Sequence, residues 1–274
     1  MNKLNTAKRI AIISALVEGN FLRSTTRMSG VSINTVTKLL VDAGKACEAY
    51  QDEVMKNLTC QRIQADEIWA FCYAKQKDVP ADKQGIKGYG DVWTWVAIDA
   101  DTKLVPTWVM GLRDADHAVE FMHDLAPRLA NRIQLTTDGL AAYGESVYSA
   151  FQNNVDYARL IKTYGTVEAG GGRYGPPICT GCTTKTVRGN PDPAHISTSF
   201  VERQNLTMRM GMRRFTRLTN GFSKKLENLG HSIALHFMHY NFVRRHQTLR
   251  VSPAMAAGVS AKLWTIEDVV SLIG

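Results

Sequence analysis

Three acidic residues, Asp66, Asp138 and Glu202, occur where a phosphoryl-transfer site could use them. Asp66 lies inside an apolar strand pattern, where aspartate is disfavoured. Asp138 directly follows a predicted strand, and Glu202 stands near the start of a predicted helix. Carboxylate oxygens are the ligands that Mg²⁺ prefers. Two such ions about 3.5–4 Å apart clamp the attacking and leaving oxygens of a phosphodiester. The three acids therefore predict a two-metal site.

Each of these acids also has a purely structural interpretation. Asp138 could belong to a turn that caps the next helix. The spacing of Ser199 and Glu202 matches a capping box, so that Glu202 would only cap its own helix. Asp66 could be paired with an arginine. The spacing alone leaves these alternatives open.

A cation accompanies the third acid. Arg209 lies seven residues after Glu202, and at about 100° per residue both side chains share one helix face. This places a positive charge near the predicted metal site, where it could bind a DNA phosphate. Two further acids, Glu67 and Asp99, are alternatives for the site.

The elements that must position these residues form an alternating pattern. Strands are predicted at residues 61–71, 92–99, 104–110, 132–136 and 157–162, and helices at 116–129, 140–151 and 200–218. A further helix is predicted over 226–246. Strands that alternate with helices after an initial run of three favour a mixed sheet with helices on its faces. The fold class is therefore α/β.

Residues 164–195 interrupt this pattern with many glycines and prolines, and a long loop or insertion is expected there. Cys179 and Cys182 within it could supply half of a zinc site, which needs four ligands. His195 follows at a zinc-finger-like spacing, but no second histidine comes three to five residues later. A pair of packed or exposed thiols is the alternative interpretation.

The first fifty residues have a helical pattern of their own. Helices are predicted at residues 6–18, 24–28 and from Ser32 to about Gly44, with a glycine-containing turn between the last two. This arrangement is typical of a helix-turn-helix. The start of its second helix would enter the major groove, presenting four polar residues: Ser32, Asn34, Thr35 and Lys38. A three-helix bundle without DNA contact is the alternative.

Charge and composition narrow the class of protein. The formal net charge is +8, with 45% hydrophobic and 21% charged residues, which are ordinary globular values. Residues 1–50 and 200–250 carry the positive excess, and basic clusters attract DNA. No apolar run is long enough to span a membrane. Five cysteines favour a reducing cytoplasm over a disulfide scaffold, and no signal peptide is evident.

The acidic blocks resemble a known family. Residues 64–69, 137–139 and 201–206 resemble the three catalytic blocks of bacterial insertion-sequence transposases of the DDE type. Residues 217–224 are similar to the insertion sequence one group. Residues 239–249, followed by Ser252-Pro253-Ala254, resemble a C-terminal signature of many such transposases. The resemblance covers about residues 60–258.

This resemblance implies a ribonuclease H-like core. Asp66 would lie on its first strand, Asp138 after its fourth strand and Glu202 on its last helix. The same three acids would be catalytic and would bind two Mg²⁺ ions, with Mn²⁺ as a substitute. Arg209 matches a basic residue that the family often places two turns after its glutamate. The separation of Asp138 and Glu202 is longer than in many relatives, and the insertion at 164–195 accounts for the excess.

The sequence thus predicts a DNA transposase with three parts. Residues 1–50 would form the helix-turn-helix domain, 58–222 the catalytic domain with its insertion, and 223–274 a C-terminal helical region. Its partners would be element ends and target DNA, bound by a homo-oligomer in the bacterial nucleoid. DNA phosphates would be bound by four arginines: Arg209, Arg213, Arg214 and Arg217. A related nuclease or resolvase, and a non-catalytic regulator derived from a transposase, are the alternatives.

Overall fold

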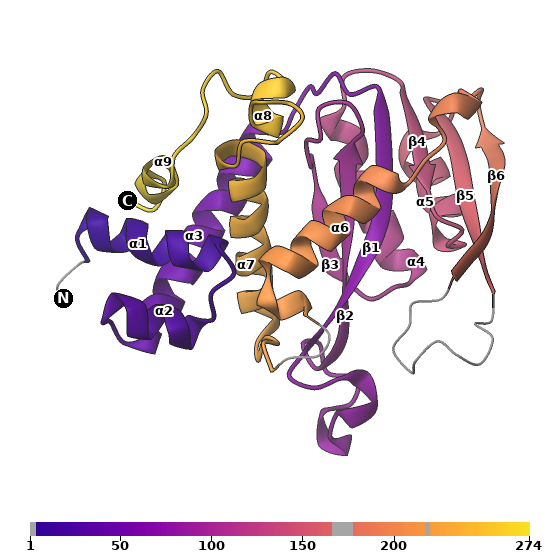
Figure 1. The fold of residues 1–274 in the computed structure, drawn as a ribbon. Coiled ribbons are helices and arrows are strands. Elements are labelled where there is room, and N and C mark those ends of the chain that lie inside the picture. Colours follow the sequence, from indigo (N-terminus) through magenta and orange to yellow (C-terminus); the bar gives the residue numbers. More distant parts are fainter. Residues whose placement is uncertain (1–3, 166–177, 217–219) are drawn as a thin grey trace.

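A six-stranded mixed sheet forms the centre of the protein (Figure 1). The computed structural model describes residues 4–165, 178–216 and 220–274. The sheet order is β3-β2-β1-β4-β5-β6. The strands are β1 (Arg62–Cys72), β2 (Gly90–Asp99), β3 (Trp108–Gly111), β4 (Ile133–Thr137), β5 (Val155–Gly165) and β6 (Ile178–Arg188). β1, β4 and β5 run parallel, and the other pairs are antiparallel. The predicted α/β class with a mixed sheet is confirmed.

Helices cover both faces of this sheet. α4 (Ala115–Leu125) and α5 (Ala142–Phe151) pack on one face, and α6 (Ser199–Gly211) packs on the other. Successive residues of a strand point to opposite faces. Ala65 accordingly belongs to the core beneath α4 and α5, whereas Ile68 belongs to the core beneath α6. Because both faces of β1 are covered, its acidic side chains are held among buried groups.

The three predicted N-terminal helices are present, as α1 (Thr6–Val17), α2 (Leu22–Ser29) and α3 (Ile33–Val54). Gly30 ends α2 in the left-handed conformation, at φ 68°, which glycine adopts without strain. Ser32 caps α3 by accepting a hydrogen bond from the amide of Thr35. The helix-turn-helix interpretation of this unit stays a prediction.

The third helix is longer than predicted, because Gly44, which indicated a helix end in the sequence, lies inside it. The sequence predicted an end near Gly44, but α3 continues to Val54. An added Cβ at Gly44 would lie 2.6 Å from the Cα of His231 in α7 (Leu226–Met238). The glycine therefore permits two helices to approach closely instead of ending one, and the predicted domain boundary at residue 50 falls inside α3.

The C-terminal region packs against the N-terminal helices. α7 lies along α3, and α9 (Ile266–Ser271) lies against α1. The predicted helix 226–246 is shorter than expected, because α7 ends at Met238 and a π-helical turn follows over His239–Val243. A short helix, α8 (Pro253–Ala256), comes between this turn and α9. One continuous apolar core joins α1, α3, α7 and α9 to the sheet.

Three other boundaries differ from the prediction. The predicted loop at 164–195 contains β6, which pairs antiparallel with β5, so Leu160 lies opposite Thr184. Thr and Val side chains suit an edge strand, and the surrounding glycines concealed this pattern. Residues 166–177 of the predicted insertion lie outside the described residues. The strand predicted at 104–110 is only β3, and the helix predicted at 200–218 ends at Gly211.

None of the helices in the described ranges is both long and apolar enough to cross a membrane.

The close approach of α3 and α7 gives a testable prediction. Gly44→Ala should lower the free energy of unfolding by about 1–3 kcal/mol, because the new methyl group overlaps the backbone of α7. Urea denaturation followed by circular dichroism would measure it. Lys45→Ala, at the exposed neighbouring position, should change stability by less than about 0.5 kcal/mol. A gain of stability in Gly44→Ala, as helix propensity alone would give, would contradict the packing of these helices.

Candidate active site

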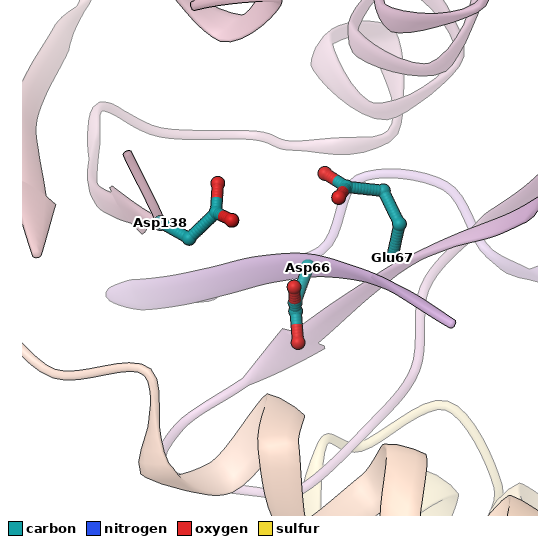
Figure 2. Close-up of side chains that lie close together, drawn as sticks. All are labelled: Asp66, Glu67 and Asp138. Carbon is teal, nitrogen blue, oxygen red and sulfur yellow. The ribbon is translucent and has the colours of Figure 1, made fainter. Parts of the chain in front are cut away.

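A compact group of three carboxylates lies at the centre of the sheet. Asp66 and Glu67 are neighbours on β1, and Asp138 directly follows β4. The parallel pairing of β1 with β4 sets Ala65 opposite Thr137, which brings Asp138 beside Asp66. One carboxylate oxygen of each of the three acids lies within 4.8 Å of the others. Figure 2 shows Glu67 and Asp138 on one side of β1 and Asp66 turned to the other.

Arg113 is the counter-charge of this acidic cluster. Its Nε donates a hydrogen bond to Oε2 of Glu67 at 3.0 Å, and its Nη2 donates to Oδ2 of Asp138 at 3.3 Å. Arg113 comes from the loop between β3 and α4 and is partly exposed. One guanidinium thus offsets two carboxylates, while Asp66 has no hydrogen bond from it. The cluster keeps a net negative charge.

Glu67 is the most enclosed member of the acidic cluster. Its side chain is fully buried and accepts hydrogen bonds from Arg113 and from the hydroxyl of Tyr143. Burial raises the pKa of Glu67 and the neighbouring Asp138 raises it further, while the hydrogen bonds from Tyr143 and Arg113 offset part of the rise. Tyr143 on α5 is also buried, and burial together with the charge of Glu67 holds its pKa well above the usual range. A buried carboxylate close to two others is costly, and a bound cation would offset this cost.

Asp66 faces α6 and has an elevated pKa. Its Oδ2 accepts a hydrogen bond from Nδ2 of Asn205 at 2.9 Å, so its partner is an amide and not the arginine of the alternative interpretation. Burial raises the pKa of Asp66 to about 7, with further contributions from the charges of Glu67, Asp138 and Glu202. Asp66 is therefore poised between its protonated and charged forms near neutral pH.

Glu202 stands in the first turn of α6, close enough for its charge to raise the pKa of Asp66. Its Oε1 accepts hydrogen bonds from Nζ of Lys162 on β5 and from Oγ1 of Thr198. Thr198 is the N-cap of α6 and makes no side-chain capping bond to the backbone. The capping box of Ser199 and Glu202 is thus not formed, and Glu202 is instead oriented by a lysine.

Two of the acids have local structural roles. Oδ1 of Asp138 accepts a hydrogen bond from the amide of Leu140 at 2.8 Å, which fixes the turn after β4 while Oδ2 faces Arg113. Asp99, an alternative acid for the site, is buried at the end of β2 and accepts hydrogen bonds from the amide and hydroxyl of Thr102. Asp99 thus stabilises a turn and is not part of the acidic cluster.

The predicted phosphate-binding arginines have different surroundings. Arg209 is half-buried on α6 and interacts within the chain. Arg213 is exposed beside the ring of Phe21, 5.6 Å from its centroid. Arg214 is half-buried and donates a hydrogen bond to Ser223, and burial lowers the pKa of Arg214 to about 10. Arg217 lies outside the described residues. Their predicted role in DNA binding stays a prediction.

The four predicted base-reading residues lie at the start of α3. Asn34 and Lys38 are exposed, and Thr35 is half-buried. Ser32 caps the helix, and its hydroxyl contacts that of Thr35 at 2.9 Å. Lys38 pairs with Asp42, at 2.5 Å, one turn later. Asn34 is therefore the member of this set with the fewest competing contacts in the chain.

The two cysteines of the predicted insertion lie together on β6. The Sγ atoms of Cys179 and Cys182 are 3.8 Å apart, and both residues are exposed. Within the described ranges, no third histidine, cysteine or acid completes a metal-binding group with them. His195 instead contacts Arg62, through Nδ1, at 2.6 Å. The two cysteines thus lie together as exposed thiols, in line with the alternative interpretation, and the zinc interpretation stays untested.

Four residues around the acids were not identified from the sequence: Arg113, Tyr143, Lys162 and Asn205. Asn205 alone carried a local signal, since it follows Glu202 by three residues and shares its helix face. The other three reach the site from separate elements, so their positions depend on how the sheet and helices pack.

Comparisons with known proteins find only a distant structural similarity to two transposases. No protein family model and no curated protein matches the chain. A Mos1 transposase paired-end complex with left transposon end is 12% identical over 57% of this chain and 59% of that chain, with a TM-score of 0.24. A piggyBac transposase synaptic complex with hairpin DNA is 9% identical over 99% and 71%, with a TM-score of 0.39. The Mos1 Strand Transfer Complex is 12% identical over 88% and 77%, with a TM-score of 0.25.

The raised pKa of Asp66 predicts a pH-dependent stability. Because this pKa is near 7 in the folded protein and near 3.8 when unfolded, the folded state holds more protons between these values, and stability falls as pH rises from about 4 to 7. Without added metal, Asp66→Asn should be about 1–3 kcal/mol more stable than wild type at pH 8.

Thermal unfolding at pH 4.5 and pH 8 would measure this difference, which should largely vanish at the lower pH. Asp116→Asn, in the exposed first turn of α4, is the matched control and should show no such gain. An Asp66→Asn variant less stable than wild type at pH 8 would contradict the charge repulsion.

Proposed function

We propose that this chain is a DNA transposase of the DDE type, which cleaves element ends and joins the resulting 3′-hydroxyl to target DNA. The observation that carries the proposal is the acidic cluster of Asp66, Glu67 and Asp138, whose carboxylate oxygens lie within 4.8 Å of one another. Glu202, in the first turn of α6, is not a member of that cluster, but its charge raises the pKa of Asp66. Asp66, Asp138 and Glu202 occupy the positions that the resemblance implies for the first strand, the fourth strand and the helix. The catalytic part would be the ribonuclease H-like domain.

The donor groups fit a hard divalent cation. Asp66, Asp138 and Glu202 would hold two Mg²⁺ ions, or Mn²⁺ in their place, because all their ligand atoms are oxygens. The buried Glu67, with a carboxylate oxygen within 4.8 Å of oxygens of Asp66 and Asp138, supports this fit and adds a fourth acid to the set. When bound, such ions stabilise the attacking and leaving oxygens of a phosphodiester.

The surrounding residues would prepare the acids for this task. Asn205 orients Asp66 through its amide, and Lys162 orients the carboxylate of Glu202. Arg113 holds Glu67 and Asp138 in place and lessens their repulsion. Because Asp66 must be ionised to serve as a ligand, metal affinity should increase as pH rises through about 7.

DNA would be held on both sides of this site. Ser32, Asn34, Thr35 and Lys38 would read the element ends from the major groove. The arginines after Glu202 would bind backbone phosphates, which carry no direct sequence information. The acting form would be a homo-oligomer on DNA in the nucleoid, with residues 1–50 as the recognition domain and 223–274 as the helical region behind it.

The decisive variant is Glu202→Gln. The amide keeps the size of the side chain and removes the charge that would hold a metal ion, so cleavage and strand transfer should fall at least about 100-fold, while DNA binding and the melting temperature change little. The measurements are plasmid cleavage with Mg²⁺ or EDTA and analysis of strand-joined products.

Glu227→Gln is the matched control, since Glu227 is exposed in the first turn of α7. Full activity in Glu202→Gln would contradict the proposed chemistry. Cleavage without joined products would indicate a nuclease or resolvase. Binding without cleavage in wild type would indicate a regulator.

A second variant, Asn34→Ala, tests sequence reading by α3. DNA sequences enriched from a random duplex library by the intact chain would serve as probes. Loss of a base contact should weaken their binding by roughly 1–3 kcal/mol and relax the choice at one position. Asn154→Ala, at an exposed position between α5 and β5, is the control for amide loss. Unchanged selection by Asn34→Ala would place recognition elsewhere in the chain.

A further inference from the structure

A cavity of about 520 Å³ lies between the N-terminal helices and the segment that follows α6. Its walls come from α1, α2 and α3 on one side and from residues 211–214 and 220–236 on the other. Two glycines permit the walls to meet. An added Cβ at Gly19 would lie 2.7 Å from the carbonyl oxygen of Gly211, and one at Gly221 would lie 2.8 Å from the ring of Phe21.

The cavity is strongly basic. Six cationic residues line it: Arg23, Arg27, Arg213, Arg214, Lys224 and Lys225. No aspartate or glutamate is among its lining residues in the described ranges. Among the same described residues, the five cations other than the enclosed Arg214 form no ion pair with an acid. Such an uncompensated positive concavity attracts a polyanion.

Aromatic and polar groups lie beneath these charges. Phe21 is 42% exposed although it lies in a concave wall, and the guanidinium of Arg213 stands beside its ring. Phe222 lines the same cavity and packs against Phe71 in a tilted arrangement, with ring centroids 5.0 Å apart. His236 lies among the lining residues with Nε2 unpartnered among the described residues, and burial lowers the pKa of His236 to about 3, so its ring is neutral. An exposed ring beside cations suits a base with its phosphate.

We propose that this cavity binds one unpaired nucleotide of a DNA strand, with the base against Phe21 and the phosphates on Arg23, Arg27, Lys224 and Lys225. Sites of about 300–1,000 Å³ enclose a small ligand, and a duplex is too wide to enter one. The proposal rests on the proposed DNA function, which it deepens by naming single-stranded DNA as the occupant.

The place of the cavity links it to the acidic cluster. α6 carries Glu202 in its first turn and ends at Gly211 on the cavity wall, and the nine steps between them rise about 13 Å. A strand whose phosphate lies at the acids would therefore have nucleotides within reach of the cavity. Unstacking one of them there would hold the DNA end near the site that cuts it.

Fluorescence anisotropy with a labelled oligothymidine of about twelve nucleotides, in EDTA and with the full chain, tests the proposal. Phe21→Ala should weaken binding to this strand about 5- to 150-fold, while binding to a blunt duplex changes less than about twofold. Phe21→Trp should retain the single-strand affinity, because it preserves the stacking surface. Equal losses on strand and duplex, or no loss on either, would overturn the proposal.

The cations need a separate test. Lys224→Ala/Lys225→Ala should flatten the slope of log affinity against log salt on the single strand by about 0.7 per lost contact. The matched control is Lys56→Ala/Lys87→Ala, which removes two exposed lysines outside the cavity and should leave this slope unchanged. Equal slopes for both double variants would overturn phosphate binding in the cavity.

Two outcomes separate this proposal from neighbouring ideas. Displacement of the oligothymidine by thymidine monophosphate at similar concentration would overturn the strand as the occupant and indicate a free nucleotide. Plasmid cleavage by Phe21→Ala is measured in parallel. Normal cleavage with unchanged single-strand binding refutes the cavity alone, whereas a wild-type chain that binds the strand but never cleaves refutes the proposed function alone.

Discussion

The structure depends on the enforced proximity of like charges in the sheet. Asp66, Glu67 and Asp138 repel one another across less than 5 Å, and Arg113 offsets only part of that repulsion. Such an arrangement persists only where the surrounding fold over-determines it. Here the pairing of β1 and β4 fixes the backbones, α6 and α5 cover the two faces, and Asn205 and Tyr143 restrict the side chains. The repulsion among these carboxylates lowers the stability of the fold at this point, and under the proposed function a bound metal ion would offset it.

The elements that carry these acids could be predicted because their patterns are local. Period-two and apolar runs located β1, β2, β4 and β5, and Ser32 with Gly30 located the turn before α3. Asp66 and Asp138 could be brought together because Asp66 lies on one strand and Asp138 directly follows a parallel neighbouring strand of the same sheet. Arg113 and Lys162 could not be assigned, since each reaches the acids only through the packing of separate elements. β6 was missed because it becomes a strand through its pairing with β5, and its own sequence has only a weak local strand pattern.

Glu202 and Gly44 each have a local sequence signature that differs from their role in the folded protein. Glu202 had the spacing of a helix cap, yet a lysine from a neighbouring strand turns its carboxylate away from the helix backbone. Gly44 had the signature of a helix end, yet it lies where another backbone comes within contact distance. Local rules describe an isolated segment, and tertiary contacts select among the outcomes those rules allow.

The shared core of α1, α3, α7 and α9 has a mechanical consequence. If a flexible linker joined the helical unit to the sheet, the distance between the two would vary widely. Here α3 packs along α7, whose neighbours extend to the sheet, so the start of α3 and the acidic cluster belong to one packed unit. Under the proposed function, the fixed distance between these two parts would set the number of base pairs between the recognised sequence and the cut.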